Sequence, residues 1–219
     1  MRISDDRYSR DRARLDIAMQ FIRHEARTRT IRLWTGLSDD RIRKLYRSYL
    51  QGGGGGLIRH RGKSPQQASF FVRTARLRQE ASALAALCCL TGVLESGRAG
   101  GQGHIAPPPA LGIGRAGSLC QAYEAYRALL VTPAIGFEHA VLLVNALARG
   151  AELRLGDCQG CGAMLVVDAL ALRPAHCAVC VPATAEARSP CTTGGRARSR
   201  ATACASKTGA ERFRAGRIR

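Results

Sequence analysis

Apolar residues in the first part of the chain recur every three or four positions, which is the spacing of one face of an α-helix. The pattern covers residues 11–35 and includes Leu15, Ile22, Ile31 and Trp34, with several arginines at the positions between them. It predicts a helix over 11–35, in which Ile31 and Trp34 either continue the first helix or form a second one.

A further helix is predicted over residues 39–50, after Gly36 interrupts the apolar pattern. Ser38 offers a side-chain oxygen as the N-cap of this helix, and Asp39 and Asp40 place negative charge at its positive end. One side of the predicted helix holds four apolar side chains, which are those of Ile42, Leu45, Tyr46 and Tyr49.

The apolar pattern in the middle of the chain predicts three more helices. The first spans residues 65–92, where a Ser-Pro pair supplies a start signal and apolar residues recur near helical spacing. Residues 97–117 contain seven glycines and three consecutive prolines, a composition typical of a loop. The other two helices are expected over 118–132 and 135–149, with Gly150 as the C-cap of the last one.

Four of the nine cysteines form two CxxC pairs near the end of the helical pattern. Cys158 and Cys161 are separated by fifteen residues from Cys177 and Cys180, which is the general spacing of a four-cysteine zinc site. Two such turns can direct four sulfurs to one Zn²⁺, at about 2.3 Å each, and leave no position for water, so the ion would be structural. Two disulfides or free thiols are the alternatives, and His176 could replace one cysteine.

The residues around these pairs agree with a zinc ribbon. Gly160 and Gly162 lie in and just after the first turn, residues 164–167 predict a short strand, and Pro174 turns the chain back. The other cysteines receive no functional assignment. Three suit small core positions and two fall near the C-terminus, and these are Cys88, Cys89, Cys120, Cys191 and Cys204.

The charge of the chain points to a polyanionic partner. Lys and Arg number 34 against 16 Asp and Glu, and the formal net charge is +18. Such an excess favours nucleic acid first and an acidic membrane surface second. The alternative is that the charge reflects an arginine-rich proteome from a GC-rich genome. Because no signal peptide and no apolar run of about eighteen residues is visible, we expect a cytoplasmic protein without membrane contact.

Residues 29–47 have the layout of a helix-turn-helix, with an apolar helix, a glycine turn and a basic helix. Five side chains would point away from the apolar face and contact phosphates or bases, and these are Arg41, Arg43, Lys44, Arg47 and Ser48. Two features depart from the motif: Arg32 replaces a small residue, and Asp39 and Asp40 bring negative charge. The alternative is a solvated basic face on an ordinary helical hairpin.

The order of these blocks resembles one known family, FlhC, the zinc-containing subunit of the bacterial flagellar master transcriptional activator. The similarity covers roughly residues 14–180. It rests on the following blocks: LDIAMQFIRHEARTRTIRLWTGLSDDRIRKLYR, GKSPQQASFFVRTARLRQEASALAAL, AYEAYRALL and LGDCQGCGAMLVVDALALRPAHCAVC. The run of glycines at 52–56, the loop at 97–117 and the arginine-rich tail are departures from the family pattern.

The resemblance implies a mainly helical fold with a zinc ribbon, whose ligands would be Cys158, Cys161, Cys177 and Cys180. It also implies a heterohexamer with an FlhD-like subunit that binds double-stranded promoter DNA and activates flagellar class II genes through RNA polymerase. The alternative function is a zinc-stabilised protein-interaction scaffold without sequence-specific DNA binding. We do not expect an enzyme, because the glycine run lacks the Lys and Ser/Thr of a P-loop and the five histidines are scattered.

These patterns together predict a mainly α protein, with a helical body, a helix-turn-helix-like N-terminal region and a small C-terminal zinc ribbon with four cysteine ligands. The predicted segments are the helix-turn-helix-like region at 1–50, a glycine-rich linker at 51–64, a helical domain at 65–150, the zinc ribbon at 151–182 and a basic, disordered tail at 183–219.

Overall fold

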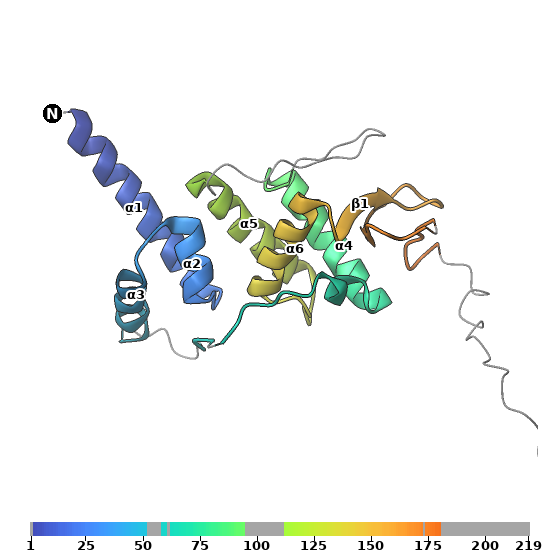
Figure 1. The fold of residues 1–219 in the computed structure, drawn as a ribbon, viewed down its shortest axis with the longest axis horizontal. Helices are drawn as coiled ribbons and strands as arrows, with labels where there is room; N and C mark the ends of the chain where they lie inside the picture. Colours follow the sequence, from blue (N-terminus) through green and yellow to red (C-terminus); the bar gives the residue numbers. More distant parts are fainter. Residues whose placement is uncertain (1, 52–57, 61, 95–111, 173, 181–219) are drawn as a thin grey trace, which may run out of the picture. The chain divides into compact units, whose positions relative to one another are not determined.

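The computed structural model describes residues 2–51, 58–60, 62–94, 112–172 and 174–180 (Figure 1). The described residues form six α-helices, one 3₁₀-helix and one antiparallel two-stranded hairpin near the C-terminal end of the described chain. The predicted fold class, mainly helical with a small four-cysteine ribbon, is therefore confirmed. The predicted tail, the glycine run and most of the predicted Gly/Pro-rich loop lie outside the described residues.

The N-terminal pattern forms two helices, α1 (Arg2–Arg23) and α2 (Thr28–Thr35). The single helix over 11–35 was therefore wrong, and the second-helix alternative is confirmed. Helix α1 ends because Glu25 adopts a left-handed conformation with φ 59°. The N–H of Glu25 donates to the Ile22 carbonyl and the N–H of Ala26 to the Phe21 carbonyl, both at 2.9 Å. These two bonds are the Schellman pattern, which more often uses glycine.

The Glu25 side chain ties a distant segment to the turn between α1 and α2. Its Oε1 accepts a hydrogen bond from the Ile58 backbone N–H at 3.1 Å, and its Oε2 lies 2.9 Å from Nε2 of His60. The Arg59 guanidinium lies over the Tyr46 ring, 5.2 Å from its centroid. Residues 58–60, which fall in the predicted linker, are thus bound to the N-terminal helices.

Helix α3 (Asp39–Gln51) follows α2 after a turn at Gly36, as predicted. Gly36 has φ 69° and donates its N–H to the Arg32 carbonyl at 2.9 Å, so a residue with a side chain would be strained there. The Ser38 side chain accepts a hydrogen bond from the Arg41 N–H at 3.4 Å, which confirms the predicted cap. Ile42 is buried.

The predicted helix over 65–92 is shorter and starts later than expected. A 3₁₀-helix, η1 (Ala68–Val72), precedes α4 (Ala75–Leu90). Thr74 is extended, with φ −128° and ψ 155°, and its hydroxyl accepts a hydrogen bond from the Leu77 N–H at 3.2 Å. This threonine therefore caps α4 and sets its first residue, instead of the Ser-Pro pair.

Helices α5 (Ile113–Leu129) and α6 (Phe137–Arg149) correspond to the last two predicted helices. The prediction of a loop up to residue 117 was wrong, since α5 includes two of the glycines assigned to the loop. One of them, Gly117, lies close to α1: a Cβ there would be 3.5 Å from Cδ1 of Ile17. The packing of α1 against α5 stabilises the first turns of α5, where the two glycines disfavour a helix. Gly150 has φ 66° and ends α6, as predicted.

Strands β1 (Leu153–Asp157) and β2 (Met164–Asp168) pair in an antiparallel hairpin beside α4 and α6 (Figure 1). The strand β2 was predicted from sequence, whereas β1 was not. All described residues belong to one compact unit. Phe21 of α1, Tyr126 of α5 and Val166 of β2 are all fully buried in the same core. The N-terminal helices, the middle helices and the hairpin therefore share one hydrophobic core. No helix in the described part of the chain is long and apolar enough to cross a membrane.

Candidate metal centre and basic helix

The hairpin presents the first CxxC pair at its tip. Asp157 pairs with Met164, and the loop between these two residues contains Cys158 and Cys161. The loop closes through the Cys158 N–H, which donates to the Ala163 carbonyl at 2.8 Å, and through a second bond from the Gly162 N–H back to the Cys158 carbonyl at 2.8 Å. The strand pairing thus fixes the place at which the first two sulfurs lie.

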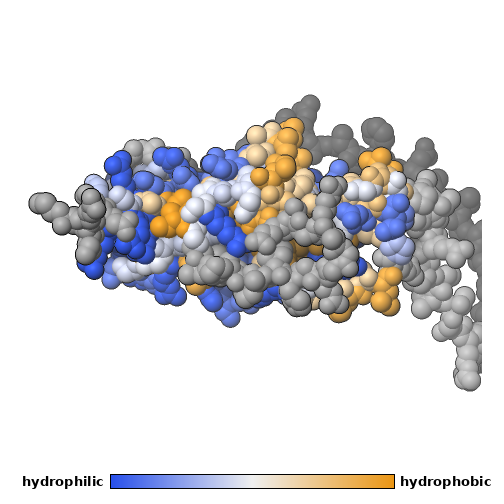
Figure 2. All heavy atoms as spheres, turned by 90° about the horizontal axis from the view of Figure 1, so that it is seen from above, coloured by the Kyte–Doolittle hydropathy of each residue, from blue (hydrophilic) through white to orange (hydrophobic). Residues whose placement is uncertain are grey.

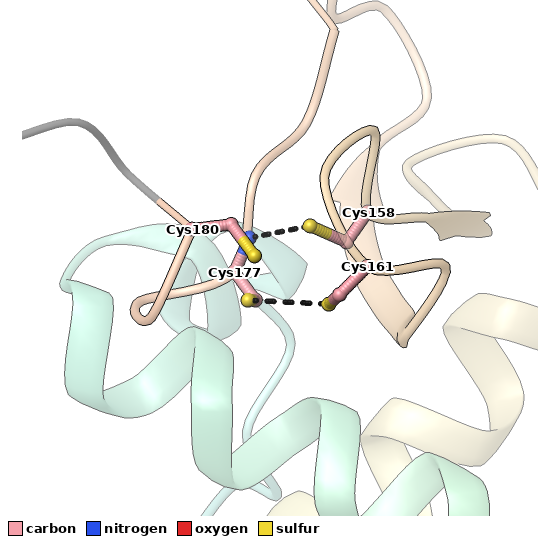
Figure 3. Close-up of side chains that lie close together, drawn as sticks. All are labelled: Cys158, Cys161, Cys177 and Cys180. Carbon is pink, nitrogen blue, oxygen red and sulfur yellow. Dashed lines mark hydrogen bonds between the residues drawn. The ribbon is translucent and has the colours of Figure 1, made fainter.

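The second CxxC pair lies against the hairpin tip and faces the first pair (Figure 3). The Gln159 N–H donates to the Ala175 carbonyl at 3.0 Å, which joins the two loops. The Cys180 N–H donates to the Cys177 carbonyl at 3.1 Å and closes the second turn. Backbone hydrogen bonds therefore hold both turns and the contact between them.

The four sulfurs form one cluster. The Sγ atoms of Cys158, Cys161, Cys177 and Cys180 all lie within 4.8 Å of one another, and those of Cys161 and Cys177 are 3.7 Å apart. A tetrahedral site with Zn–S bonds of about 2.3 Å has sulfurs about 3.8 Å apart. None of the four forms a disulfide, so the alternative of two disulfides is not what the structure shows. The predicted ligands come together in a geometry that suits a metal ion, and His176 is not part of the cluster.

Backbone N–H groups point at one of the sulfurs. Cys158 Sγ accepts hydrogen bonds from the Cys177 N–H at 3.3 Å and from the Gly160 N–H at 3.4 Å. The bond from Cys177 is the main reason that the pKa of Cys158 is lowered to about 6. Hydrogen bonding to Cys177 instead raises the pKa of Cys180 to about 12. Crowded sulfurs cannot all ionise without a compensating charge, and a divalent cation would supply that charge.

Gly160 is required by the close approach of the two turns. A Cβ at this position would lie 2.9 Å from Cβ of Cys180 and 3.0 Å from its Sγ. Contacts this short force one of the turns to move. Gly160 lies in the first turn, as the sequence predicted, and the structure shows that the lack of space against Cys180 is the reason for a glycine there.

The strand β2 connects the cluster to the helical body because its side chains alternate between two cores. Val166 is fully buried in the main core. Leu165 and Val167, on the opposite face, pack with Cys158 in a small core of their own. The Val166 N–H donates to the hydroxyl of the buried Ser82 on α4 at 2.9 Å. Sequence reasoning missed Ser82, which gives no local signal of this contact.

The basic residues predicted on the second helix of the helix-turn-helix-like region share the exposed face of α3. All five are exposed, and they are Arg41, Arg43, Lys44, Arg47 and Ser48. Among the described residues, Arg41, Lys44 and Arg47 have no carboxylate partner, whereas Arg43 lies 3.1 Å from Asp40. The face therefore presents cationic groups that are available to an anionic partner.

The two departures from the helix-turn-helix pattern lie next to each other. Nη1 of Arg32 on α2 is 3.6 Å from Oδ1 of Asp39 at the start of α3. Since Asp40 is paired with Arg43, each aspartate at this helix start lies beside an arginine. The negative charge that the sequence places near the basic face is therefore offset locally.

The remaining cysteines behave as core residues where they are described. Cys88 and Cys120 are buried, and burial raises the pKa of each thiol to about 12. Cys89 is partly buried, and burial raises its pKa as well. The predicted core role is thus confirmed for Cys88 and Cys120, while Cys191 and Cys204 lie outside the described residues.

No family model matches the chain, and no curated protein matches it.

Proposed function

We propose that this chain is a DNA-binding subunit of a transcriptional activator, as its resemblance to FlhC implies. The observation that supports this best is the exposed basic face of α3. This helix follows α2 after a glycine turn, and its opposite side buries Ile42 and Tyr46. On the face drawn in Figure 2, the end of the molecule that holds the N-terminal helices is largely hydrophilic. A helix with one anchored side and one cationic side is suited to the major groove and to phosphates.

In this proposal one structural Zn²⁺ is held by Cys158, Cys161, Cys177 and Cys180. Its chemical contribution is to neutralise the thiolates and to join the two CxxC turns. Structural zinc sites have apparent binding free energies of about 10–16 kcal/mol in small peptides, which is enough to decide whether residues 157–180 fold. The protein would use the ion for architecture, because four thiolates leave no coordination position for a substrate.

The partners in this proposal come from the resemblance. They are an FlhD-like subunit in a heterohexamer, promoter DNA of flagellar class II genes, and RNA polymerase. The net charge of +18 agrees with a polyanionic partner. We therefore expect the partner complex, rather than the isolated chain, to show the preference for promoter sequence.

The salt dependence of DNA binding tests the proposal. The zinc-loaded full chain, co-purified with an FlhD-like partner, is titrated with promoter duplex at several salt concentrations. Six to ten phosphate contacts would weaken binding by about 10³- to 10⁵-fold between 50 and 200 mM salt. Arg47→Gln removes an unpaired cation from α3 and should reduce the slope of log K against log salt by about 1.

The matched control is Arg149→Gln, since Arg149 is an exposed arginine at the end of α6. This variant should bind promoter DNA as the wild type does. A flat salt response would contradict the proposal, and so would an equal effect of the two substitutions.

The alternative is a zinc-stabilised scaffold for protein association. Three apolar side chains of the ribbon region support it, because they are almost completely exposed: Leu170 (84%), Leu172 (100%) and Val179 (88%). Apolar side chains that are this exposed are available for contact with a protein partner. A complex with the partner that shows no preference for promoter over random duplex would favour this function.

A further inference from the structure

A groove of about 340 Å³ is lined by residues that belong neither to the cysteine cluster nor to α3. The segment 64–67 forms one side of it, and Phe70, Arg73 and His139 form the rest. Phe70 belongs to η1, Arg73 follows it directly, and His139 lies in the first turn of α6. Ligand sites of small molecules begin at about 300 Å³, so the groove has room for one small ligand.

The groove contains a stacked aromatic pair. The ring centroids of Phe70 and His139 are 4.4 Å apart, with 28° between their planes. The guanidinium of Arg73 lies over the same phenyl ring, 5.9 Å from its centroid. Three planar groups are thus gathered at an open groove. A planar heteroaromatic ligand can extend such a stack.

One cationic side chain, that of Arg73, lines the groove, and no carboxylate does. Arg73 is exposed and has no ion pair in the described part of the chain. Arg27 lies near His139: burial first, and then the charge of Arg27, lower the pKa of that imidazole. Nε and Nη1 of Arg27 are buried and have no hydrogen-bond partner. A neutral imidazole offers its ring face for stacking, while Arg73 supplies the charge at the groove.

The acidic side chain next to His139 in the sequence is hydrogen-bonded to another part of the chain. Glu138 precedes His139, but its Oε1 accepts a hydrogen bond from the Arg27 backbone N–H at 2.7 Å. Its Oε2 accepts one from the Thr30 hydroxyl at 3.0 Å. Both oxygens therefore bind the start of α2, and neither neutralises Arg73.

We propose that this groove binds a nucleotide unit, that is, an aromatic base joined to a phosphate. The base stacks on the Phe70–His139 pair, Arg73 binds the phosphate, and the exposed amides of Gln66 and Gln67 are placed to reach polar edges of the base. The unit is either a free mononucleotide or an unpaired nucleotide of a single strand. The site goes beyond duplex binding by α3, because a base within a duplex is already stacked and paired.

Calorimetric titration of the zinc-loaded full chain tests this site with four probes: AMP, adenosine, ribose 5-phosphate and a single-stranded oligonucleotide of eight deoxyadenosines. AMP should bind more tightly than adenosine or ribose 5-phosphate, because only AMP has both the base and the phosphate. Loss of stacking weakens binding by about five- to 150-fold per base, so Phe70→Leu should reduce AMP affinity at least fivefold. Arg73→Gln should reduce it as well, and the control Arg149→Gln should leave it unchanged.

The outcomes separate the two sources of the nucleotide. If AMP binds, and its affinity falls in Phe70→Leu and Arg73→Gln, a free mononucleotide is a sufficient ligand for the groove. Binding of the oligonucleotide alone, with the same dependence, identifies a single strand. The proposal is overturned if neither probe binds, if ribose 5-phosphate binds as tightly as AMP, or if Arg149→Gln weakens binding as much as Arg73→Gln.

Phe70 is partly buried, so thermal unfolding of Phe70→Leu is measured beside the wild type. Should that variant fail to fold, Arg73→Gln decides the question, because this side chain is exposed and makes no ion pair among the described residues. Duplex binding by α3 does not involve either residue. A failure of the nucleotide site and a failure of the proposed DNA-binding function therefore give different results.

Discussion

The hydroxyl of Ser82 on α4 accepts a hydrogen bond from the backbone N–H of Val166 on β2, at 2.9 Å. The same hydroxyl donates to the Arg78 carbonyl at 2.7 Å. Both Ser82 and Val166 are buried. This one side chain therefore joins the helical body to the strand whose other face packs with Cys158.

We expect Ser82→Ala to reduce the free energy of unfolding of the zinc-loaded protein by about 1–3 kcal/mol, because it leaves a buried N–H without a partner. Urea denaturation followed by circular dichroism measures the change. Ser69→Ala is the control, since Ser69 is exposed and its side chain makes no hydrogen bond within the described chain. If the two variants were equally stable, the Ser82 bond would contribute nothing to the attachment of the hairpin.

Replacement of one cluster cysteine should abolish tight metal binding. We expect the wild type to contain one zinc per chain and Cys161→Ser to contain almost none, because a hydroxyl is a poor substitute for a thiolate ligand. Cobalt substitution gives an independent measurement through the absorption of a tetrahedral thiolate site.

Cys89→Ser is the matched control, because Cys89 is partly buried in α4 and lies outside the cluster. It should retain one zinc per chain. Full metal content in Cys161→Ser would refute the four-thiolate site.

Gly160→Ala should weaken metal binding although it changes no ligand. The added methyl group would lie 2.9 Å from Cβ of Cys180, so the two turns must separate. Competition with a chelator of known affinity should show at least a tenfold loss, which corresponds to about 1.4 kcal/mol.

Gly114→Ala is the control for the chemical change itself. Nothing lies within 4 Å of a Cβ at Gly114, which is inside α5. Alanine there should leave metal affinity unchanged and stabilise the helix by up to about 1 kcal/mol. Equal metal affinity in both variants would show that the turns tolerate a side chain at 160.

The buried carboxylate Glu80 should make stability depend on acid pH. Burial opposes its ionisation, but hydrogen bonds from the Tyr126 hydroxyl, the Ala134 N–H and the Arg76 guanidinium outweigh burial and lower its pKa from 4.5. A group with a lowered pKa in the folded state stabilises the protein above its unfolded pKa. That contribution is lost as the pH falls below about 4.5 and through the folded pKa.

Urea denaturation at pH values from 7 down to 3 measures this loss. Glu80→Gln cannot titrate, so its stability should fall less steeply below about pH 4.5 than that of the wild type. Asp16→Asn, at an exposed position of α1, serves as the control and should follow the wild-type curve. Parallel curves for wild type and Glu80→Gln would contradict the role of this carboxylate.

Local patterns in the sequence were sufficient for most of the secondary structure. Helix α3 was predicted to within one residue because its signals, Gly36 and Ser38, are adjacent to it. Gly150 likewise marked the end of α6. The predicted starts of α4 and α5 were wrong, because Thr74 and the packing against Ile17 outweighed the Ser-Pro signal and the glycines.

The sequence by itself determined the helical character of the chain, its charge and the four cysteines of the candidate metal site, because helical periodicity and CxxC turns are local. Only the tertiary structure decided which partners the side chains of Glu25, Ser82 and Glu80 bind. Their partners lie far along the chain: His60 is 35 residues from Glu25, and Val166 is 84 residues from Ser82. Such contacts form when the core packs, so no local pattern can predict them.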